Sequence, residues 1–405
     1  MRILAITPML PWPLAHGGRI RTHALLTGLA AEHEVVALAG ARNGDSEHAA
    51  AALAKHGVAL HSAPLTPRHG ALNTRERLAK MWLLLRGRSA LLPRFYSAAM
   101  AALVQREAAR GYDAVLLDHV WMEPYLALVP KVPLLFSTQN MESQLIRDKA
   151  QDLPFAARTL ALREANLLQQ VEARLARSAR LTLAVSTADK QALDALGARA
   201  CELVPNGVQL AERPLLPAVG GTPKLLFVGG ADYAPNAAAA LCLAREVLPL
   251  VRRELPEAEV LLVGEDPDGV LEVLRGLPGV RLLGAIPDML PAWEQSHILV
   301  TPLRHGGGSR LKLLEAFAVG RPVVSTAVGA AGLPVQHGRD LLLAETPAEI
   351  AARSVQLLQD AALCAALVAA ARRVAEAHDW AQIQCQLRTV VAAAFGRGAN
   401  RDSAA

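Results

Sequence analysis

The sequence predicts an α/β protein with two Rossmann-like, doubly wound parallel-sheet domains that face each other across a cleft. Its 405 residues exceed what one hydrophobic core usually organises. Short apolar runs alternate with longer segments of helical periodicity, which is typical of βαβ units. This alternation occurs in both halves of the chain. Sheets of this kind bind ligands beyond the carboxyl ends of their strands, so we expect the functional residues in the loops there.

In the first half, six apolar runs predict strands, and the segments between them predict helices. The longest helical pattern, at 154–177, leaves its charged residues for the exposed side. The predicted strands are Arg2–Thr7, Glu34–Ala39, Val58–Ser62, Ala114–Asp118, Val132–Ser137 and Leu181–Ser186.

The second half begins after the turn signal at 204–207, which a proline- and glycine-rich stretch follows. We therefore expect an N-terminal domain at 1–204 and a C-terminal domain at 205–378. Its apolar runs are short and continuous, as expected for strands covered on both faces. The predicted strands are Lys224–Val228, Glu259–Val263, Arg281–Leu283, Ile298–Pro302 and Pro322–Ser325.

Composition argues against several classes of protein. With 52% hydrophobic and 20% charged residues, the chain has too much apolar material for a disordered protein. The four cysteines have no CxxC spacing, so we expect neither a zinc site nor disulfides. We also expect no cofactor. Prolines break the first apolar run too early for a signal peptide, and no uncharged run is long enough for a spanning helix. We therefore expect a cytoplasmic protein.

The segment His305–Ala316 carries the most information about function. Three glycines follow a predicted strand and precede a helix for which Ser309 is a suitable N-cap. Glycines let the backbone approach a phosphate, and a helix N-terminus attracts anions. Arg310 and Lys312 oppose the helix dipole unless an anion lies beside them, so we place a diphosphate here, with Glu315 as acceptor for a ribose diol. The alternative is a plain glycine loop followed by a local Lys312–Glu315 ion pair.

The stretch Gly308–Thr326 resembles the donor-binding segment of the group 1 glycosyltransferases, also called glycosyltransferase family 4, which have the GT-B fold. Val204–Val208 is similar to the segment that opens the family's C-terminal domain. Phe227–Gly230 is similar to its first strand and phosphate-facing loop. The resemblance covers most of the chain and implies a nucleoside-diphosphate sugar as donor substrate. It also implies a last helix, 379–396, that returns to the N-terminal domain.

The resemblance implies which residues bind the donor. Pro11–Arg21 is similar to the N-terminal loop that closes on the donor phosphates and the acceptor. The donor-binding candidates are Gly17, Gly18, Gly229, Gly230, Asn236, Gly307, Gly308, Ser309, Arg310, Lys312, Leu313 and Glu315.

Two positions depart from the family's pattern. The family commonly has two glutamates that bracket seven residues, and Gly307 stands at the first of these positions. The family also often has a basic pair after the first C-terminal strand, where Gly229–Asn236 contains none. Our hypothesis is that Arg310 and Lys312 supply the missing charge and stabilise the leaving diphosphate.

On the acceptor side, His119 follows a predicted strand and corresponds to a histidine that family members present to the acceptor. Histidine transfers protons near neutral pH, so His119 is a catalytic candidate. Arg310 and Lys312, which stabilise the leaving diphosphate in our hypothesis, are the other catalytic candidates. Asn140 and Glu142, after the next strand, are further acceptor-side candidates. The alternatives are a structural histidine and an ordinary helix N-cap with Glu142 in the first turn.

The basic excess, a net charge of +5, is concentrated at 68–110. Residues 73–88 combine basic and apolar side chains at helical spacing. Residues 73–94 therefore predict either a peripheral contact with the anionic inner face of the cell membrane, or a helix packed by its apolar side with a solvated basic face. Aromatic residues are only 4% and no stacking motif accompanies these charges, so we expect no nucleic acid as partner.

The sequence thus predicts a glycosyltransferase that moves a sugar to a glycan or lipid-linked acceptor, in the synthesis of cell-surface polysaccharide or glycolipid. The resemblance implies retention of anomeric configuration and no essential metal. A nucleotide-sugar epimerase of the same fold is the alternative, and a basic nucleic-acid-binding protein is a weaker one. Absence of GxGxxG and GxxxxGK[ST] argues against a nicotinamide-dependent dehydrogenase and a P-loop enzyme.

Overall fold

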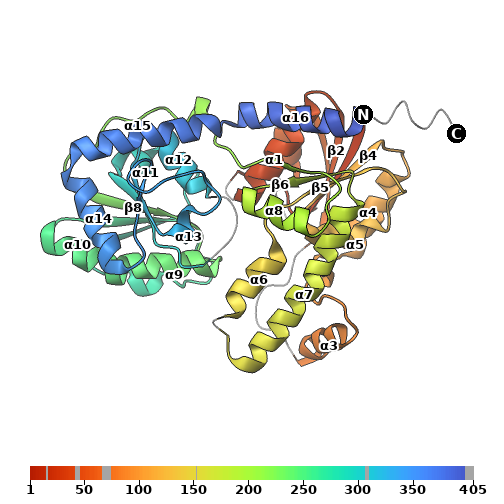
Figure 1. The fold of residues 1–405 in the computed structure, drawn as a ribbon, viewed down its shortest axis with the longest axis horizontal. Coiled ribbons are helices and arrows are strands. Elements are labelled where there is room, and N and C mark those ends of the chain that lie inside the picture. The colour runs from red at the N-terminus through yellow and green to blue at the C-terminus, as the bar shows by residue number, and fades with distance from the viewer. Residues whose placement is uncertain (15–16, 42–45, 66–73, 152, 306–309, 397–405) are drawn as a thin grey trace. The chain divides into compact units, whose positions relative to one another are not determined.

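The computed structural model describes residues 1–14, 17–41, 46–65, 74–151, 153–305 and 310–396. The chain divides into two compact units. The first contains Met1–Pro205 and the segment from Ile383 onward, and the second contains Asn206–Gln382. Each unit is built on one parallel sheet with helices against it (Figure 1). The predicted architecture of two Rossmann-like α/β domains is confirmed.

The sheet of the first unit has seven strands in the order β3-β2-β1-β4-β5-β6-β7. All of its strand pairs are parallel, with β1 and β4 at the centre and buried along almost their whole length. The strands are β1 (Arg2–Thr7), β2 (Glu34–Ala41), β3 (Val58–Pro64), β4 (Ala114–Asp118), β5 (Leu134–Ser137), β6 (Leu181–Ala184) and β7 (Cys201–Leu203).

Helices cover this sheet and extend beyond it. α6 and α7 pack against each other, and in Figure 1 they project together from the sheet on the side where α3 also lies. The helices are α1 (Gly17–Ala30), α2 (Ser46–Ala54), α3 (Thr74–Leu85), α4 (Ala98–Ala108), α5 (Glu123–Leu126), α6 (Glu142–Ala150), α7 (Phe155–Ser178) and α8 (Thr187–Ala195), with the short 3-10 helices η1 (Leu92–Phe95) and η2 (Val120–Met122).

The sheet of the second unit has six strands in the order β10-β9-β8-β11-β12-β13. The strands are β8 (Lys224–Val228), β9 (Glu259–Val263), β10 (Val280–Gly284), β11 (Ile298–Thr301), β12 (Val323–Ser325) and β13 (Leu342–Leu343). The helices are α9 (Ala234–Cys242), α10 (Leu248–Glu254), α11 (Leu290–Gln295), α12 (Leu311–Val319), α13 (Ala327–Ala330), α14 (Pro347–Gln359) and α15 (Ala361–Ala377). Two 3-10 helices, η3 (Leu210–Glu212) and η5 (Glu272–Leu274), complete it.

The last helix, α16 (Trp380–Gly396), begins in the second unit and continues into the first. Within the first unit its residues make defined contacts. The side-chain amide of Gln384 donates to the carbonyl of Ala24 at 2.9 Å, and Gln386 donates to the carbonyl of Leu203 at 2.8 Å. The helix therefore packs onto α1 and the end of β7.

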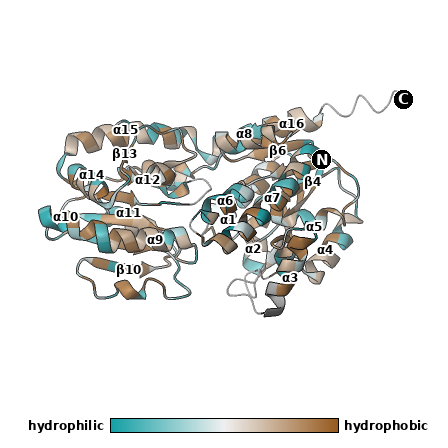
Figure 2. Cartoon of the chain, turned by 60° about the horizontal axis from the view of Figure 1, so that its bottom comes forward, coloured by the Kyte–Doolittle hydropathy of each residue, from teal (hydrophilic) through white to brown (hydrophobic). Residues whose placement is uncertain are grey.

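Hydrophobic residues fill the strands and the helix faces against them (Figure 2). One helical stretch of the described chain, Ala234–Glu254, is long and apolar enough to span a membrane, which the sequence analysis did not expect. It comprises α9, the π-helical η4 (Leu243–Val247) and α10, and half of its apolar window is buried. Its buried side chains belong to the hydrophobic core of the second unit. We therefore describe it as a core helix of this unit.

Candidate functional site

The start of α12 is the centre of the predicted donor site. Arg310 occupies the N-cap position, one residue later than the predicted cap Ser309, and its side chain caps no backbone N–H. Its Nε and Nη2 atoms donate to the carbonyl of Val328 at 3.2 and 2.9 Å, and the residue is buried. Burial lowers the pKa of Arg310. Gly307, Gly308 and Ser309 lie outside the described residues.

Lys312 extends from the first turn of α12 toward the loop after β8. Its Nζ donates to Oδ1 of Asn236 at 3.1 Å and lies 4.7 Å from the centre of the Phe227 ring. Burial and the nearby Arg310 lower the pKa of Lys312 to about 7, while Glu315 acts in the opposite direction. No carboxylate in the described part of the chain forms an ion pair with Lys312. The lysine is thus a weakly compensated cation that suits an anionic ligand.

Asn236 connects Lys312 to the glycine loop after β8. Its Nδ2 donates to the carbonyl of Gly230 at 3.1 Å, while its Oδ1 accepts from Lys312. A Cβ atom at Gly229 would lie only 2.6 Å from Cγ of Asn236, so a larger residue cannot stand there without displacing the amide. The structure thus brings four donor candidates together, namely Lys312, Asn236, Gly229 and Gly230.

A pocket of about 270 Å³ opens at the carboxyl ends of β8, β9 and β10. Phe227, which lies beneath Lys312, is one of its walls, and Gly264 and Gly284 are others. Gly264 has φ 152°, and a Cβ there would lie 2.3 Å from the carbonyl oxygen of Gly229. The sequence analysis missed this pocket, although each of these two glycines directly follows a predicted strand.

Two further donor candidates have partners within the second unit. Glu315 has Oε1 3.6 Å from Nη2 of Arg213, so the local ion pair with Lys312 that we considered is not formed. Burial raises the pKa of Glu315, and Arg213 opposes this shift. Leu313 is fully buried in the core, and its N–H donates to the carbonyl of Arg310 at 2.8 Å. Its side chain is therefore a core residue and is not available to a donor.

His119 has an unusual backbone conformation. It follows β4 with φ 86°, the only positive φ of a non-glycine residue in the described ranges. Its Nδ1 accepts from the N–H of Trp121 at 3.5 Å, and its Nε2 lies 3.2 Å from Oε1 of Glu142. With Nδ1 as acceptor, Nε2 is the ring nitrogen that donates a hydrogen bond to Glu142. Such strain is retained where surrounding contacts enforce it, and it is common at functional sites.

The other acceptor-side candidates lie beside His119. Nδ2 of Asn140 is 3.4 Å from the same Oε1 of Glu142. Glu142 is the first residue of α6, and the N-cap position is that of Met141, not Asn140. The structure thus brings His119, Asn140 and Glu142 into one polar cluster, with Oε2 of Glu142 accepting from no donor among the described residues.

A second polar cluster lies at the start of α1. Oγ1 of Thr22 donates to Oδ2 of Asp118 at 2.5 Å, and Nε2 of Gln139 approaches both oxygens at 3.3 and 3.4 Å. A Cβ at Gly18 would lie 2.7 Å from Oε1 of Gln139, and Gly17 is the first residue of α1. Gly18 therefore allows α1 to pack closely on the strand-end residues. The sequence analysis missed Thr22, because it belongs to no motif, whereas Gln139 begins the segment of the acceptor-side candidates Asn140 and Glu142.

The candidates consequently form two sets, one in each unit. In the described ranges no three histidine, cysteine, aspartate or glutamate side chains are grouped as the ligands of a metal ion would be.

Two protein-family models match this chain. A model described as "Glycosyl transferases group 1" matches residues 222–360, and one described as "Glycosyltransferase Family 4" matches residues 15–212. A phosphatidyl-myo-inositol mannosyltransferase of Propionibacterium freudenreichii is 34% identical over 130 residues, which are 30% of this chain and 32% of that protein. The matched region is therefore about a third of the length of such curated relatives.

Solved structures are similar over almost the whole chain. HepE of Anabaena, in complex with UDP and glucose, has a TM-score of 0.67 and 16% identity, covering 97% of this chain and 99% of that one. Sucrose-phosphate synthase from Thermosynechococcus elongatus has a TM-score of 0.70 and 20% identity, covering 98% and 100%. At these identities the similarity concerns the fold. The epimerase alternative gains no support from these relatives.

Proposed function

Because the chain belongs to the group 1 glycosyltransferases of the family 4 type, we propose that it transfers a sugar from a nucleoside-diphosphate sugar to a glycan or lipid-linked acceptor. The observation that carries this proposal is the position of Lys312. Its ammonium group donates to Asn236, which contacts the glycine loop, and lies over the ring of Phe227, a wall of the pocket at the strand ends. A nucleoside in the pocket places its diphosphate near this cation. The complexes of HepE with UDP and with UDP-glucose support a ligand of this class.

The proposed mechanism is electrostatic. Cleavage of the sugar–phosphate bond leaves growing negative charge on the diphosphate, and positive groups that are already in place lower the barrier. Lys312, Arg310 and the N-terminus of α12 supply these groups. We propose retention of anomeric configuration and no essential metal, because the family resemblance implies both and these cations can neutralise the leaving group. Glu315 is proposed to accept hydrogen bonds from the ribose.

The first unit is proposed to bind the acceptor. Oε1 of Glu142 receives hydrogen bonds from His119 and Asn140, which fix the orientation of the carboxylate. Its other oxygen can then accept a hydrogen bond from an acceptor hydroxyl. His119 and Glu142 thereby orient the attacking oxygen, and His119 can stabilise a proton that moves during transfer.

The protein is further proposed to be cytoplasmic and to attach to an anionic membrane surface through α3. Leu78, Trp82 and Leu85 of this helix are 67%, 51% and 71% exposed, and Met81 is exposed as well. Their spacing places them on one stripe of the helix. A helix packed by its apolar side onto the domain, our alternative, explains the buried Leu84 but not these four. A role in cell-surface polysaccharide or glycolipid synthesis would agree with such attachment.

Thermal unfolding with a panel of UDP-, GDP-, ADP- and CMP-sugars tests the donor site. A ligand at about 100 times its Kd adds roughly 2.7 kcal/mol to the free energy of unfolding, which raises Tm by several degrees. We expect this shift with one nucleotide sugar in the wild type and its loss in Lys312→Met. A control, Arg339→Met, changes an exposed basic residue of the same unit and should keep the shift. No shift with any nucleotide sugar would overturn the proposal.

A further inference from the structure

We propose that a pocket beside α3 in the first unit binds one amphiphilic molecule with an apolar chain and a phosphate headgroup. This inference rests on the proposed function in one respect, because the molecule is assigned as the lipid anchor of the acceptor. The pocket has a volume of about 530 Å³, twice that of the pocket in the second unit, and lies within the range of ligand-binding cavities. It is formed by the end of α3 and the turn after it, together with η1, α5 and α7.

The walls of the pocket suit an apolar chain. Leu83, Leu92, Pro124, Leu167 and Val171 contribute apolar surface. Leu92 and Val171 are buried and belong to the core of the first unit, so they form a fixed floor. Burial of a methylene group on such a surface contributes about 0.8 kcal/mol. Burial of several methylene groups therefore contributes enough binding free energy to favour transfer of the chain from water into the pocket.

The charges at the pocket favour an anionic headgroup. Two arginines line it, and they differ in their partners. Nη2 of Arg174 lies 3.1 Å from Oε1 of Glu123, so its charge is compensated. Arg88 forms no ion pair with any carboxylate in the part of the chain that the structure describes, and its side chain is exposed. A guanidinium binds phosphate through paired hydrogen bonds, and we assign the headgroup to Arg88.

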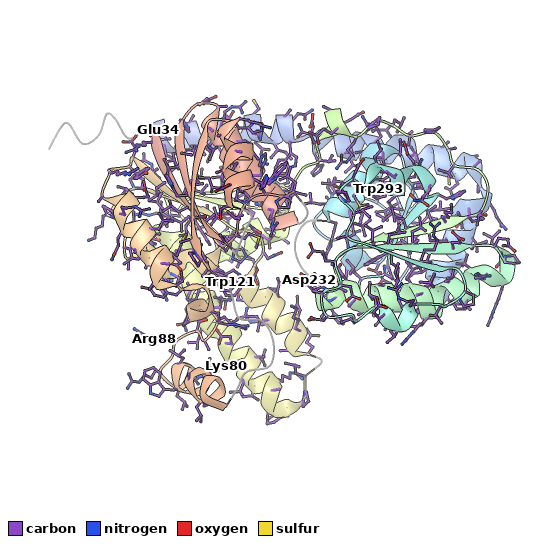
Figure 3. All side chains as sticks on the ribbon, turned by 180° about the vertical axis from the view of Figure 1, so that it is seen from behind. Glu34, Lys80, Arg88, Trp121, Asp232 and Trp293 are labelled. Carbon is purple, nitrogen blue, oxygen red and sulfur yellow. The ribbon has the colours of Figure 1, made fainter. Side chains whose placement is uncertain are left out.

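The C-terminal end of α3 contributes to this pocket. The helix ends at Leu85, and Leu83, Gly87 and Arg88 of its last turn and the following turn line the pocket. Figure 3 shows Lys80 and Arg88 on the same segment of the chain. Arg86 lies over the ring of Trp82 at 4.0 Å, so a basic group accompanies the apolar stripe. The helix that carries the exposed apolar stripe therefore also contributes Leu83 to the pocket.

A stack of three rings connects the pocket to the acceptor-side cluster. Trp121 is parallel to the His119 ring, with centroids 5.4 Å apart, and to the Phe95 ring at 4.9 Å. Phe95 belongs to η1, whose neighbouring residues Pro93 and Tyr96 line the pocket. The segment at η1 thus contributes both to the pocket wall and, through Phe95, to the ring stack on His119.

The test is isothermal titration of the full chain with dodecyl phosphate below its critical micelle concentration. Inorganic phosphate and dodecyl maltoside, titrated in parallel, separate the contribution of the headgroup from that of the chain. We expect dodecyl phosphate to bind at least about tenfold more tightly than either. Arg88→Glu should weaken its binding about tenfold, and Leu167→Trp, which fills the pocket, should abolish it. Arg177→Glu, an exposed position on α7 outside the pocket, should bind as the wild type does.

Equal affinity in the wild type, Arg88→Glu and Leu167→Trp would overturn the inference, as would equally tight binding of inorganic phosphate. Gln170→Trp, at an exposed lining position, is the second pocket-filling variant if Leu167→Trp does not fold. The same samples are titrated with the nucleotide sugar identified by thermal unfolding. Loss of dodecyl phosphate binding with intact donor binding is expected for the pocket variants. A wild type that binds dodecyl phosphate but no nucleotide sugar would refute the proposed function and leave the pocket assignment intact.

Discussion

Lys312 is the residue on which the donor site depends most, and its pKa of about 7 makes a test possible. A bound diphosphate favours the charged ammonium, so binding raises this pKa. Above pH 7 the free protein must take up a proton to bind the donor, and the Kd therefore increases with pH, by at most about tenfold per unit. Titration calorimetry with the donor at pH 8, in buffers of different ionisation enthalpy, should show uptake of about one proton. Lys312→Met should show none, and uptake that persists in this variant would contradict the assignment.

The backbone of His119 has a φ of 86°, a conformation that favours glycine. Replacing His119 by glycine and by alanine therefore separates a functional role of its side chain from a structural one. His119→Ala removes the side-chain contacts and keeps the strain, whereas His119→Gly also relieves it. We expect His119→Gly to be more stable than His119→Ala by about 1 kcal/mol in urea unfolding. Both variants should lose transfer activity by about 100-fold or more. A glycine variant with wild-type activity would show that the histidine is only structural.

Which site residues the sequence could predict depends on whether a motif contains them. Lys312 and Arg310 were found because two cations at a helix start require an explanation. Asn236 was a candidate only because it follows the glycines after the first strand of the second unit. Its contact with Lys312 joins residues 76 positions apart in the chain, so the sequence did not predict it. Trp121 was missed because a lone aromatic residue after a strand has no motif, and its stacking becomes visible only in three dimensions.

Among the elements, strands that are buried on both faces were the most predictable. β1, β4, β8 and β9 begin and end at the predicted residues, since continuous apolar runs mark them clearly. β7 and β13, with three and two residues, were missed because such short edge strands have no recognisable periodicity. The helix α3 was expected, but its exposed apolar stripe was left open between two interpretations. The exposure of these side chains supports the proposed membrane contact, and the vesicle experiment below tests it.

The close approach of Gly264, directly after β9, to the backbone of Gly229 predicts how substitutions there change the free energy of unfolding. Gly264→Ala introduces both an unfavourable φ and a Cβ that would lie 2.3 Å from a backbone oxygen. Gly276→Ala, at φ 84° with nothing within 4 Å, introduces the unfavourable φ alone. We expect Gly276→Ala to cost about 1 kcal/mol and Gly264→Ala roughly 3 kcal/mol of unfolding free energy. Equal costs in urea unfolding would show that the close approach of the two loops is not as described.

The apolar stripe of α3 predicts binding to anionic vesicles. Trp82→Ser combined with Leu85→Ser should reduce co-sedimentation with vesicles rich in phosphatidylserine by at least about tenfold, because apolar burial and basic charge act together there. Val273→Ser, an equally exposed apolar position in the second unit, is the control and should bind normally. Unchanged binding of the α3 variant would exclude this helix as the membrane contact.

At the scale of the whole molecule, the proposed function divides the substrates between the two units. The second unit contains the pocket at the strand ends with Lys312, and the first contains the His119 cluster and the pocket beside α3. The sequence predicted this division because the alternation of strands and helices occurs twice. It did not predict the pocket beside α3, whose walls come from segments more than 80 residues apart, such as Leu83 and Val171.

The most direct test of sugar transfer is to follow the release of nucleoside diphosphate from the selected nucleotide sugar on addition of a bacterial lipid extract. We predict release that depends on the extract, equals the amount of glycosylated lipid formed, and falls by at least about 100-fold in Lys312→Met. The product should keep the anomeric configuration of the donor, as measured by NMR. Release at the same rate in Lys312→Met, or conversion of the nucleotide sugar without any glycosylated product, would contradict the account.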